Sequence, residues 1–247
     1  FVESVTEVMN SINMSWELII VDDGSDDGSS KILKNIGHQE NIRSILLSKN
    51  YGQTTAIQAG FDNAVGEYFV TLDSDLQNDP KDIPTLIKKL INEELDLVVG
   101  WRKDRKDNYF FRNLPSILAN KLIGTITGVK LHDYGCSLKA YRGEVLREVK
   151  LYGEMHRFIP AWMATKIPAS KISEIEVTHH PRIAGESKYG ISRTFRVIVD
   201  LISVYFFMKF FSRPGHFFGL VGLLLSSFGT LILIYLISLK LIYGLDI

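Results

Sequence analysis

Short apolar runs alternate with amphipathic stretches over the first 150 residues of the chain. The apolar runs have the length of strands, and apolar positions at helical spacing fill the intervals between them. The predicted strands are residues 17–21, 42–47, 68–72, 95–99 and 137–141, and the predicted helices are residues 29–36, 54–64, 82–93 and 112–126. This alternation is typical of an α/β fold in which helices cover both faces of a mostly parallel sheet.

The last part of the chain is much more apolar than the rest. Residues 217–239 carry no charged side chain, and a helix of that length, at ~1.5 Å rise per residue, covers roughly 35 Å, which is enough to cross a bilayer core. A buried helix of a soluble domain is the alternative, but a run without a polar face would need protein on every side. We therefore expect a transmembrane helix over residues 214–243, after an α/β domain over residues 1–190.

A basic, amphipathic stretch separates the predicted domain from the predicted span. Residues 191–213 are expected to form a helix that lies in the membrane interface, and such helices are compatible with packing between protomers of a homo-oligomer. From Arg182 to Arg213, two acidic residues, Glu186 and Asp200, stand against six basic ones: Arg182, Lys188, Arg193, Arg196, Lys209 and Arg213. This excess favours contact with anionic lipid and a domain that faces the cytoplasm.

Composition adds a few limits. The 247 residues are 46% hydrophobic with a formal net charge of zero, which gives no sign of a nucleic-acid partner. Cys136 is the only cysteine, so no intrachain disulfide can form and a reducing compartment is favoured. The chain starts without Met or a signal peptide and stops soon after one span, so we expect both ends to be truncated.

Two acidic clusters follow predicted strands, and the carboxyl ends of strands form the ligand crevice in sheets of this kind. Asp73-Ser-Asp75 comes directly after residues 68–72. Two such carboxylates can share one Mg²⁺ or Mn²⁺, whose remaining positions are filled by substrate phosphates, and a departing nucleotide diphosphate needs that charge neutralisation. A solvated acidic loop is the alternative, and the position after a buried strand favours the metal.

The second cluster, Asp22-Asp-Gly-Ser25, holds the equivalent position after the first strand. A carboxylate there could accept a hydrogen bond from a base or a ribose hydroxyl, and Gly24 would allow a sharp turn. A turn that only caps the next helix is the equally weighted alternative. The glycine pattern of a dinucleotide site is absent, which argues against an NAD enzyme.

Several motifs together resemble glycosyltransferase family 2 with its GT-A fold. They are Val21-Asp-Asp-Gly-Ser25, Asn50-Tyr-Gly52 with Ala59-Gly60, and Asp73-Ser-Asp-Leu-Gln-Asn-Asp-Pro80. The later segments resemble polyprenyl-phosphate hexosyltransferases, a group that includes dolichol-phosphate mannose synthases and bacterial undecaprenyl-phosphate glucosyltransferases: His156-Arg-Phe-Ile-Pro160, His180-Pro-Arg182 and Gly185-Glu-Ser-Lys-Tyr189. Two parts of the family pattern are missing, namely a first strand with a Pro-x-Tyr-Asn-Glu-like nucleotide contact and a second span.

The resemblance implies a role for each matching position. The metal would be held by Asp73, Asp75 and Gln77, and the donor would contact Asp22, Asp23, Gly24, Ser25 and Asp73. Donor or acceptor phosphate would be bound by Arg102, Arg112, Ser116, Arg182, Ser187 and Lys188, because guanidinium groups bind phosphate in bidentate fashion. The catalytic residues would be Asp133, Arg182 and Lys188. Ordinary surface positions are the alternative for Arg102 and Arg112, and snorkelling to the interface is the alternative for Lys188.

The expected reaction is metal-dependent transfer of a hexose from a nucleotide-sugar to a polyprenyl phosphate, with inversion at the anomeric carbon. Since the acceptor phosphate is already anionic, alignment and charge neutralisation would matter more than a base. The resemblance implies UDP-glucose as the favoured donor and GDP-mannose as the next, and it implies the bacterial inner membrane as the expected location. The alternatives are a membrane scaffold that kept the fold without turnover, and a processive polysaccharide synthase, whose Gln-x-x-Arg-Trp motif is absent. His156, His179 and His180 fit no common zinc spacing and are expected to be loop or core residues.

Overall fold

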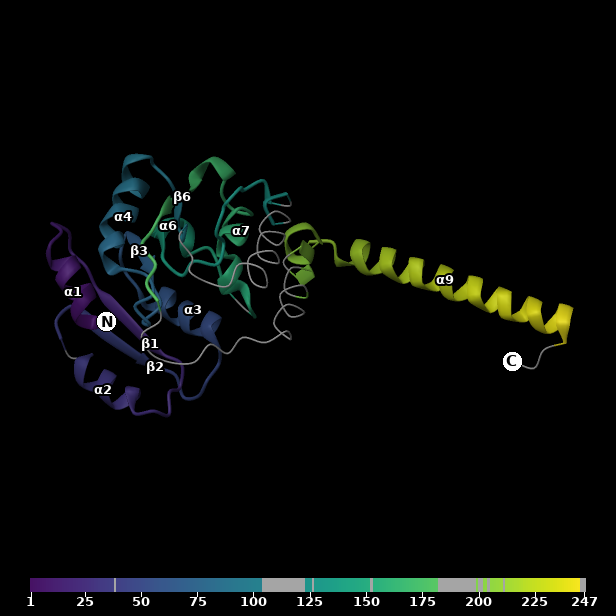
Figure 1. Ribbon diagram of the computed structural model, residues 1–247, viewed down its shortest axis with the longest axis horizontal. Coiled ribbons are helices and arrows are strands. Elements are labelled where there is room, and N and C mark those ends of the chain that lie inside the picture. Colours follow the sequence, from purple (N-terminus) through teal and green to yellow (C-terminus); the bar gives the residue numbers. More distant parts are fainter. Residues whose placement is uncertain are drawn as a thin grey trace. The chain divides into compact units, whose positions relative to one another are not determined.

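The computed structural model describes residues 1–37, 39–103, 123–125, 127–151, 153–181, 199, 202–203, 205–210 and 212–244. Figure 1 shows the course of the chain through its labelled elements. The chain divides into two compact units, Phe1–Leu201 and Ile202–Ile247. The first unit holds the described strands, and the second holds the long helix α9 (Pro214–Tyr243).

The described strands form two sheets. In the first, β1 (Leu18–Asp22) pairs in parallel with β2 (Ile42–Leu46), with Leu18 opposite Ile42 and Asp22 opposite Leu46. The second sheet has the order β3-β5-β4-β6. Its strands are β3 (Tyr68–Thr71), β5 (Lys139–Arg142), β4 (Leu97–Trp101) and β6 (Ile172–Glu176). β4 and β6 are parallel, whereas β5 is antiparallel to both of its neighbours.

The α/β class is therefore confirmed, but the second sheet is mixed rather than mostly parallel. Lys139, the first residue of β5, pairs with Thr71 and Val99 near the carboxyl ends of β3 and β4. β5 thus begins at the edge of the sheet where its neighbours end. An apolar run has no direction of its own, so the sequence pattern could not reveal this reversal. Its consequence is that the residues just before β5 lie at the same edge as those just after β3 and β4.

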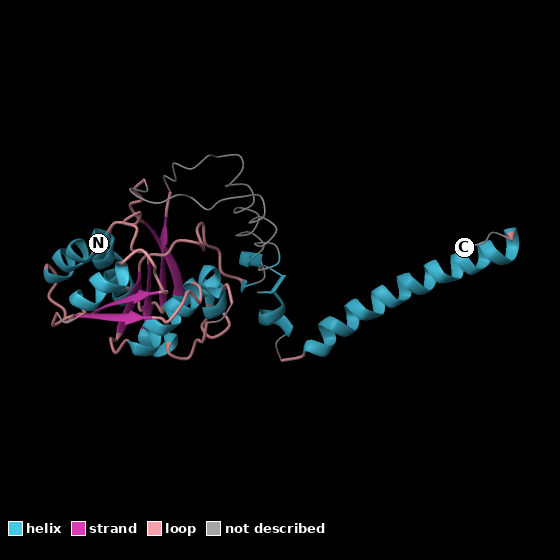
Figure 2. Cartoon of the chain, turned by 90° about the horizontal axis from the view of Figure 1, so that it is seen from below, coloured by secondary structure: helices cyan, strands magenta, loops and turns pink. Residues whose placement is uncertain are grey.

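Helices pack on both sheets, as Figure 2 shows in cyan around the magenta strands. α3 (Gln53–Asn63) packs on β1, α2 (Ser29–Ile36) on β2, and α4 (Ile83–Asn92) on β4 and β5. The buried residues of α4 recur at helical spacing: Ile83, Leu86, Ile87 and Leu90. Residues 97–99 of β4 are fully buried, which explains why this strand is a continuous apolar run.

Several elements were not predicted from the sequence. They are α1 (Val2–Asn10), β6, α6 (Gly143–Leu146), α7 (Ile159–Met163) and the short 3₁₀ helices η1 (Pro80–Asp82), η2 (Met155–Phe158) and η3 (Ala169–Lys171). β6 was missed because its sequence, Ile-Ser-Glu-Ile-Glu, is as polar as a surface loop. The predicted helix over residues 112–126 lies outside the described residues except at its end, where residues 123–125 are helical.

A groove of about 790 Å³ separates the two sheets. Residues 18–21 of β1 and residues 68–71 of β3 line it, together with side chains from α1, α3 and α4 such as Val5, Ile57 and Ile87. Among the described strands, β1 pairs only with β2 and β3 only with β5. Each of these two strands therefore has one edge without a strand partner, and both strands border the same apolar groove.

In the second unit, α9 is 30 residues long. Of the helices that the structure describes, it alone is long and apolar enough to cross a membrane. Its apolar side chains are widely exposed, with Phe228 and Leu231 each at 65%, and this composition favours membrane attachment, as the sequence predicted. Within the predicted interfacial segment, residues 199, 202–203 and 205–210 are helical, whereas residues 212–213 are not. The rest of that segment lies outside the described residues, so an interfacial position stays a prediction.

Candidate active site

The chain turns sharply at the end of β1, and this turn requires glycine. Gly24 has a φ of +71°, and a Cβ atom there would lie 2.4 Å from the carbonyl carbon of Lys49. Only glycine allows both this conformation and this approach. Asp22 closes the turn, because its buried carboxylate accepts hydrogen bonds from the hydroxyls of Ser25 and Ser30. These hydrogen bonds hold the pKa of Asp22 below its ordinary value.

Asp23 and Gln53 bring the ends of β1 and β3 together. The carboxylate of Asp23 accepts hydrogen bonds from the backbone N–H groups of Tyr51 (2.7 Å) and Gly52 (2.8 Å). The next residue, Gln53, donates from its side chain to Asp73 at 3.0 Å. One short segment thus bonds to a carboxylate of each predicted acidic cluster, and the two clusters share one edge of the fold. Contact of Asp22 or Asp23 with a donor stays a prediction, since both carboxylates bond to the chain itself.

Asp73 lies in a half-buried position between groups of both charges. Burial raises the pKa of Asp73, and a hydrogen bond with Ser137 opposes that rise. The nearby charge of Asp75 raises the pKa of Asp73 further, while the charges of Lys139 and Arg102 lower it. Such a carboxylate is stabilised in its ionised form by added positive charge, which a divalent cation would supply.

The oxygen atoms of Asp73, Asp75 and Gln77 form a donor set that suits Mg²⁺ or Mn²⁺. They lie in one compact turn, in which Asp75 accepts a hydrogen bond from the backbone N–H of Gln77 at 3.1 Å. Within the described residues, no three His, Cys, Asp or Glu side chains gather into a metal cage. Two carboxylates are nevertheless what a cation needs when substrate phosphates complete its coordination. The residues therefore fit a cation that is bound together with a diphosphate.

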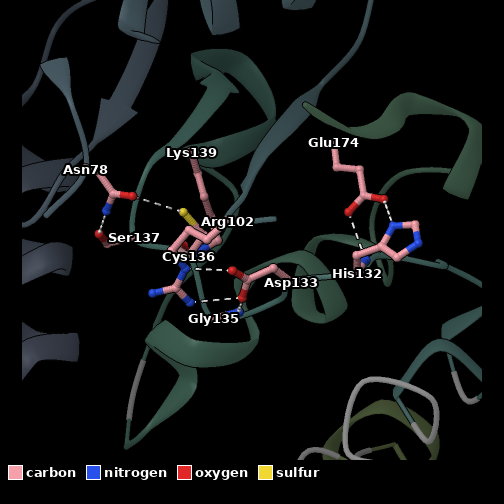
Figure 3. A network of polar contacts seen from close by, with 9 residues as sticks. All are labelled: Asn78, Arg102, His132, Asp133, Gly135, Cys136, Ser137, Lys139 and Glu174. Carbon is pink, nitrogen blue, oxygen red and sulfur yellow. Dashed lines mark hydrogen bonds and ion pairs between the residues drawn. The ribbon is translucent and has the colours of Figure 1, made fainter. Parts of the chain in front are cut away.

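Arg102, the residue after β4, forms a bidentate ion pair with Asp133 (Figure 3). Nε donates to Oδ2 at 2.6 Å and Nη2 donates to Oδ1 at 3.0 Å. Both side chains are only 11% exposed. Burial works against the charge of Arg102, but the hydrogen bonds and the charge of Asp133 outweigh it and raise the pKa of Arg102. The predicted phosphate-binding arginine and the predicted catalytic carboxylate are therefore direct partners.

Lys139 belongs to the same network, although the sequence analysis did not single it out (Figure 3). Its side chain is buried and its ammonium group donates to the backbone carbonyl of Cys136. Burial lowers the pKa of Lys139, while the charges of Asp133 and Asp73 act in the opposite direction. The available signal was a lysine inside the apolar run from Leu138 to Tyr141, because lysine is almost never fully buried unless it is paired.

The loop that follows β3 is bonded to segments distant in sequence. Asn78 donates to the hydroxyl of Ser137 at 2.9 Å, just before β5. The backbone N–H of His180 donates to the carbonyl of Gln77 at 2.7 Å, and the imidazole of His180 lies 3.2 Å from Asp79. These contacts hold the candidate metal loop between the start of β5 and the chain beyond β6.

His156 and His179, the other two histidines weighed as metal ligands, also have partners in the protein. Nδ1 of His156 lies 2.7 Å from the hydroxyl of Thr54, at the start of α3, and His179 forms a β-bridge with Asn78. These positions are consistent with the loop and core roles expected for them. Five predicted phosphate-binding residues lie outside the described residues, and their roles stay predictions: Arg112, Ser116, Arg182, Ser187 and Lys188.

An α/β domain with paired carboxylates after one strand and an arginine after another, at a common sheet edge, suits the binding of a divalent cation together with a phosphate-bearing ligand. The sequence matches the glycosyl transferase family 2 over residues 1–150, which is more than half of the chain. The chain belongs to this family, and its enzyme class is glycosyltransferase.

Similar proteins extend the match beyond that region. A protein of Rhizobium johnstonii described as dodecaprenyl-phosphate galacturonate synthase is 57% identical over 248 residues, covering 100% of this chain and 73% of the relative. A protein of Shewanella sediminis described as undecaprenyl-phosphate 4-deoxy-4-formamido-L-arabinose transferase is 38% identical over 239 residues, covering 96% of this chain and 70% of the relative.

Solved structures support the fold. Glucosyl-3-phosphoglycerate synthase of Mycobacterium tuberculosis, in complex with Mn²⁺, UDP-glucose and phosphoglyceric acid, superposes with a TM-score of 0.58 at 19% identity, covering 82% of this chain and 74% of that one. The same enzyme with phosphoglyceric acid gives a TM-score of 0.59 at 17% identity, over 83% and 75% of the two chains. The GT-A architecture predicted from the sequence is confirmed.

Proposed function

We propose that this chain transfers a sugar from a nucleotide-sugar to the phosphate of a polyprenyl-phosphate lipid at a membrane. The observation that carries the proposal is the convergence of Asp73, Asp75 and Arg102 at one sheet edge, in a chain that continues into the apolar helix α9. Family membership supports the glycosyltransferase chemistry. The names of the Rhizobium and Shewanella relatives, which specify dodecaprenyl and undecaprenyl phosphate, support the lipid acceptor.

In this reaction an oxygen of the acceptor phosphate attacks the anomeric carbon, and the bond from that carbon to the nucleotide diphosphate breaks with inversion. Asp73, Asp75 and Gln77 would hold Mg²⁺ or Mn²⁺, which supplies positive charge to the departing diphosphate when it is bound. Arg102 adds a fixed cation next to this carboxylate pair. The attacking phosphate oxygen is already ionised at neutral pH, so no base has to remove a proton from it. Catalysis then rests mainly on alignment of the reactants and on stabilisation of the developing charge by fixed cations.

The identity of the transferred sugar is a separate proposal. The sequence motifs favoured glucose, with mannose next. The relative that is 57% identical over the whole chain is named for galacturonate, so galacturonate becomes our first choice and the two neutral hexoses become the comparison. A donor with a nucleoside diphosphate leaving group suits each of these sugars equally.

A transfer assay tests the reaction and the sugar together. The chain is purified in detergent and incubated with undecaprenyl phosphate, Mn²⁺ and labelled UDP-galacturonate, UDP-glucose or GDP-mannose. We expect organic-extractable label that is lost when a chelator is added, with UDP-galacturonate the best donor. Polymeric product would favour a processive synthase instead. If no donor gives lipid product, and calorimetry finds no Mn²⁺-dependent binding of UDP, the chain is a scaffold that kept the fold.

The orientation in the membrane follows from charge. Arg213 immediately precedes α9 and Lys209 lies four residues earlier, whereas the first turn of α9 contains no acidic residue. We propose a catalytic domain on the cytoplasmic side, because basic residues next to a span are retained there. Cysteine labelling of Ser212 changed to Cys in intact cells tests this: labelling by an impermeant reagent without lysis would contradict it.

The groove between β1 and β3 is a candidate binding site for the N-terminal strand that is part of the glycosyltransferase family 2 pattern. Both bordering strands lack a partner on one side in the described part of the chain, and the ends of both meet through Tyr51, Gly52 and Gln53. We propose that a further parallel strand fills this groove and joins the two sheets. Hydrogen exchange would show it: in a version extended at the N-terminus, the amides of β1 and β3 should exchange more slowly, and unchanged rates would contradict the proposal.

A further inference from the structure

The Arg102–Asp133 pair assigns a role to Asp133 that its sequence position does not reveal. We propose that Asp133 is a positioning residue, which orients the guanidinium group of Arg102 toward a phosphate-bearing ligand, and that it does not act as a base. This inference rests on the proposed function, in which both donor and acceptor carry phosphate groups.

The oxygen atoms of Asp133 are already used by the protein. Oδ2 accepts from Nε of Arg102 at 2.6 Å, and Oδ1 accepts from Nη2 at 3.0 Å and from the backbone N–H of Gly135 at 3.1 Å. All three donors stabilise the ionised carboxylate. A base must reach the proton that it removes and bind it, and here that would require the ion pair to open inside a site where each partner is 11% exposed.

The geometry of the pair also leaves part of the guanidinium group available. Arginine has five N–H donors, and Asp133 takes one from Nε and one from Nη2. Among the residues that the structure describes, no other acceptor bonds to the remaining three. A guanidinium group that is clamped on one side in this way presents a rigid fork on the other, which suits the bidentate recognition of phosphate.

The surroundings of the pair support a ligand rather than a purely structural role. Arg102 directly follows β4 and Asp73 lies just beyond β3, and the first residue of β5, Lys139, pairs near the carboxyl ends of both strands, so the arginine lies at the same end of the sheet as the candidate metal loop. Lys139, Cys136 and Asp73 are the other titratable groups around it. By contrast, the next residue, Lys103, forms an equally short ion pair with Glu176 (2.6 Å) in which both side chains are more than half exposed.

A double-mutant cycle tests the assignment. Asp133→Asn keeps the size of the side chain but removes one of the two acceptors for the guanidinium group. We expect kcat/KM to fall about 10- to 100-fold, the size of a lost hydrogen bond to a charged group, mainly through KM. Arg102→Lys, which cannot form the bidentate pair, should cause a similar loss. In the double variant the two losses should not multiply, because each removes the same interaction.

Two binding measurements show whether Arg102 holds the donor diphosphate or the acceptor phosphate. Calorimetry with UDP and Mn²⁺ reports on the donor diphosphate, and KM for undecaprenyl phosphate reports on the acceptor. The ligand whose affinity falls in both single variants is the one that Arg102 holds. Lys103→Met is the matched control, since it breaks an ion pair of the same length one residue away, and it should change kcat/KM less than twofold.

The results distinguish failure of the positioning role of Asp133 from failure of the proposed function. If Asp133→Asn lowers kcat by the same factor in the unmodified chain and in the Arg102→Lys variant, Asp133 acts independently and the positioning role is wrong. If Asp133→Asn does not fold, Arg102→Lys alone decides, because a change below twofold in every binding and kinetic constant would also refute the role. If the unmodified chain shows no transfer and no nucleotide binding, it is the proposed function that fails.

Discussion

Replacing Gly24 by alanine would test whether the close approach of two loops builds the donor end of the site. At a φ of +71° an L-residue costs roughly 1–2 kcal/mol relative to glycine. The added Cβ would also lie 2.4 Å from the carbonyl carbon of Lys49, and ordinary contacts begin near 3.4 Å, so one loop must move by about 1 Å. Overpacking of this kind adds about 1–3 kcal/mol, which gives a total loss of about 2–5 kcal/mol in the free energy of unfolding.

Gly128→Ala provides the control. Gly128 has nearly the same φ, +74°, but nothing lies within 4 Å of its added Cβ. Alanine restricts the unfolded chain equally in both variants, so the difference between them isolates the cost of the close approach. For a chain of this size 1 kcal/mol corresponds to roughly 2–4 °C in Tm. We expect Gly128→Ala to lower Tm by about 2–8 °C and Gly24→Ala to lower it by several degrees more.

The same displacement should reach the site. The loop that follows Lys49 supplies the backbone N–H groups of Tyr51 and Gly52 to Asp23, and Gln53 to Asp73. A shift of about 1 Å breaks hydrogen bonds of 2.7–3.0 Å. Calorimetry should therefore show weaker Mn²⁺-dependent binding of UDP in Gly24→Ala and unchanged binding in Gly128→Ala. Equal Tm values and equal affinities in the two variants would refute this reasoning.

Three further predictions concern separate parts of the molecule. Asp75→Ala should abolish transfer and Mn²⁺-dependent binding of UDP, and more than about a tenth of the activity would contradict the metal assignment. The pKa of Asp22 lies below its ordinary value of 3.8 because of Ser25 and Ser30, so its contribution to stability is present above about pH 4 and is lost as the pH falls through the folded-state pKa; unfolding curves of Asp22→Asn should lack this pH dependence. Leu231→Arg in the middle of α9 should cost about 2.5–3.5 kcal/mol of membrane insertion and shift protein out of the membrane fraction, and unchanged fractionation would argue against a span.

Local patterns were enough to predict much of this chain. The helix over residues 29–36 was predicted with the bounds of α2, and strands were predicted within two residues of β1, β2, β3 and β4. The reason is that burial imposes a period of two or 3.6 on the sequence. The carboxylates of Asp73 and Asp75 could be singled out because ligands bind where strands end, and α9 because a bilayer needs a long apolar run.

The tertiary structure alone decided which distant residues meet. The direction of β5 depends on where the chain returns to the sheet, and that direction brings Asp133 and Lys139 to the ends of β3 and β4. Arg102 and Asp133 lie 31 positions apart in the sequence and were predicted to have separate functions, whereas in the structure they are partners in one ion pair. Residue types and spacing report on burial and local geometry. Pairing between distant side chains depends on how the strands and loops pack in the tertiary structure, and a local sequence pattern does not contain that information.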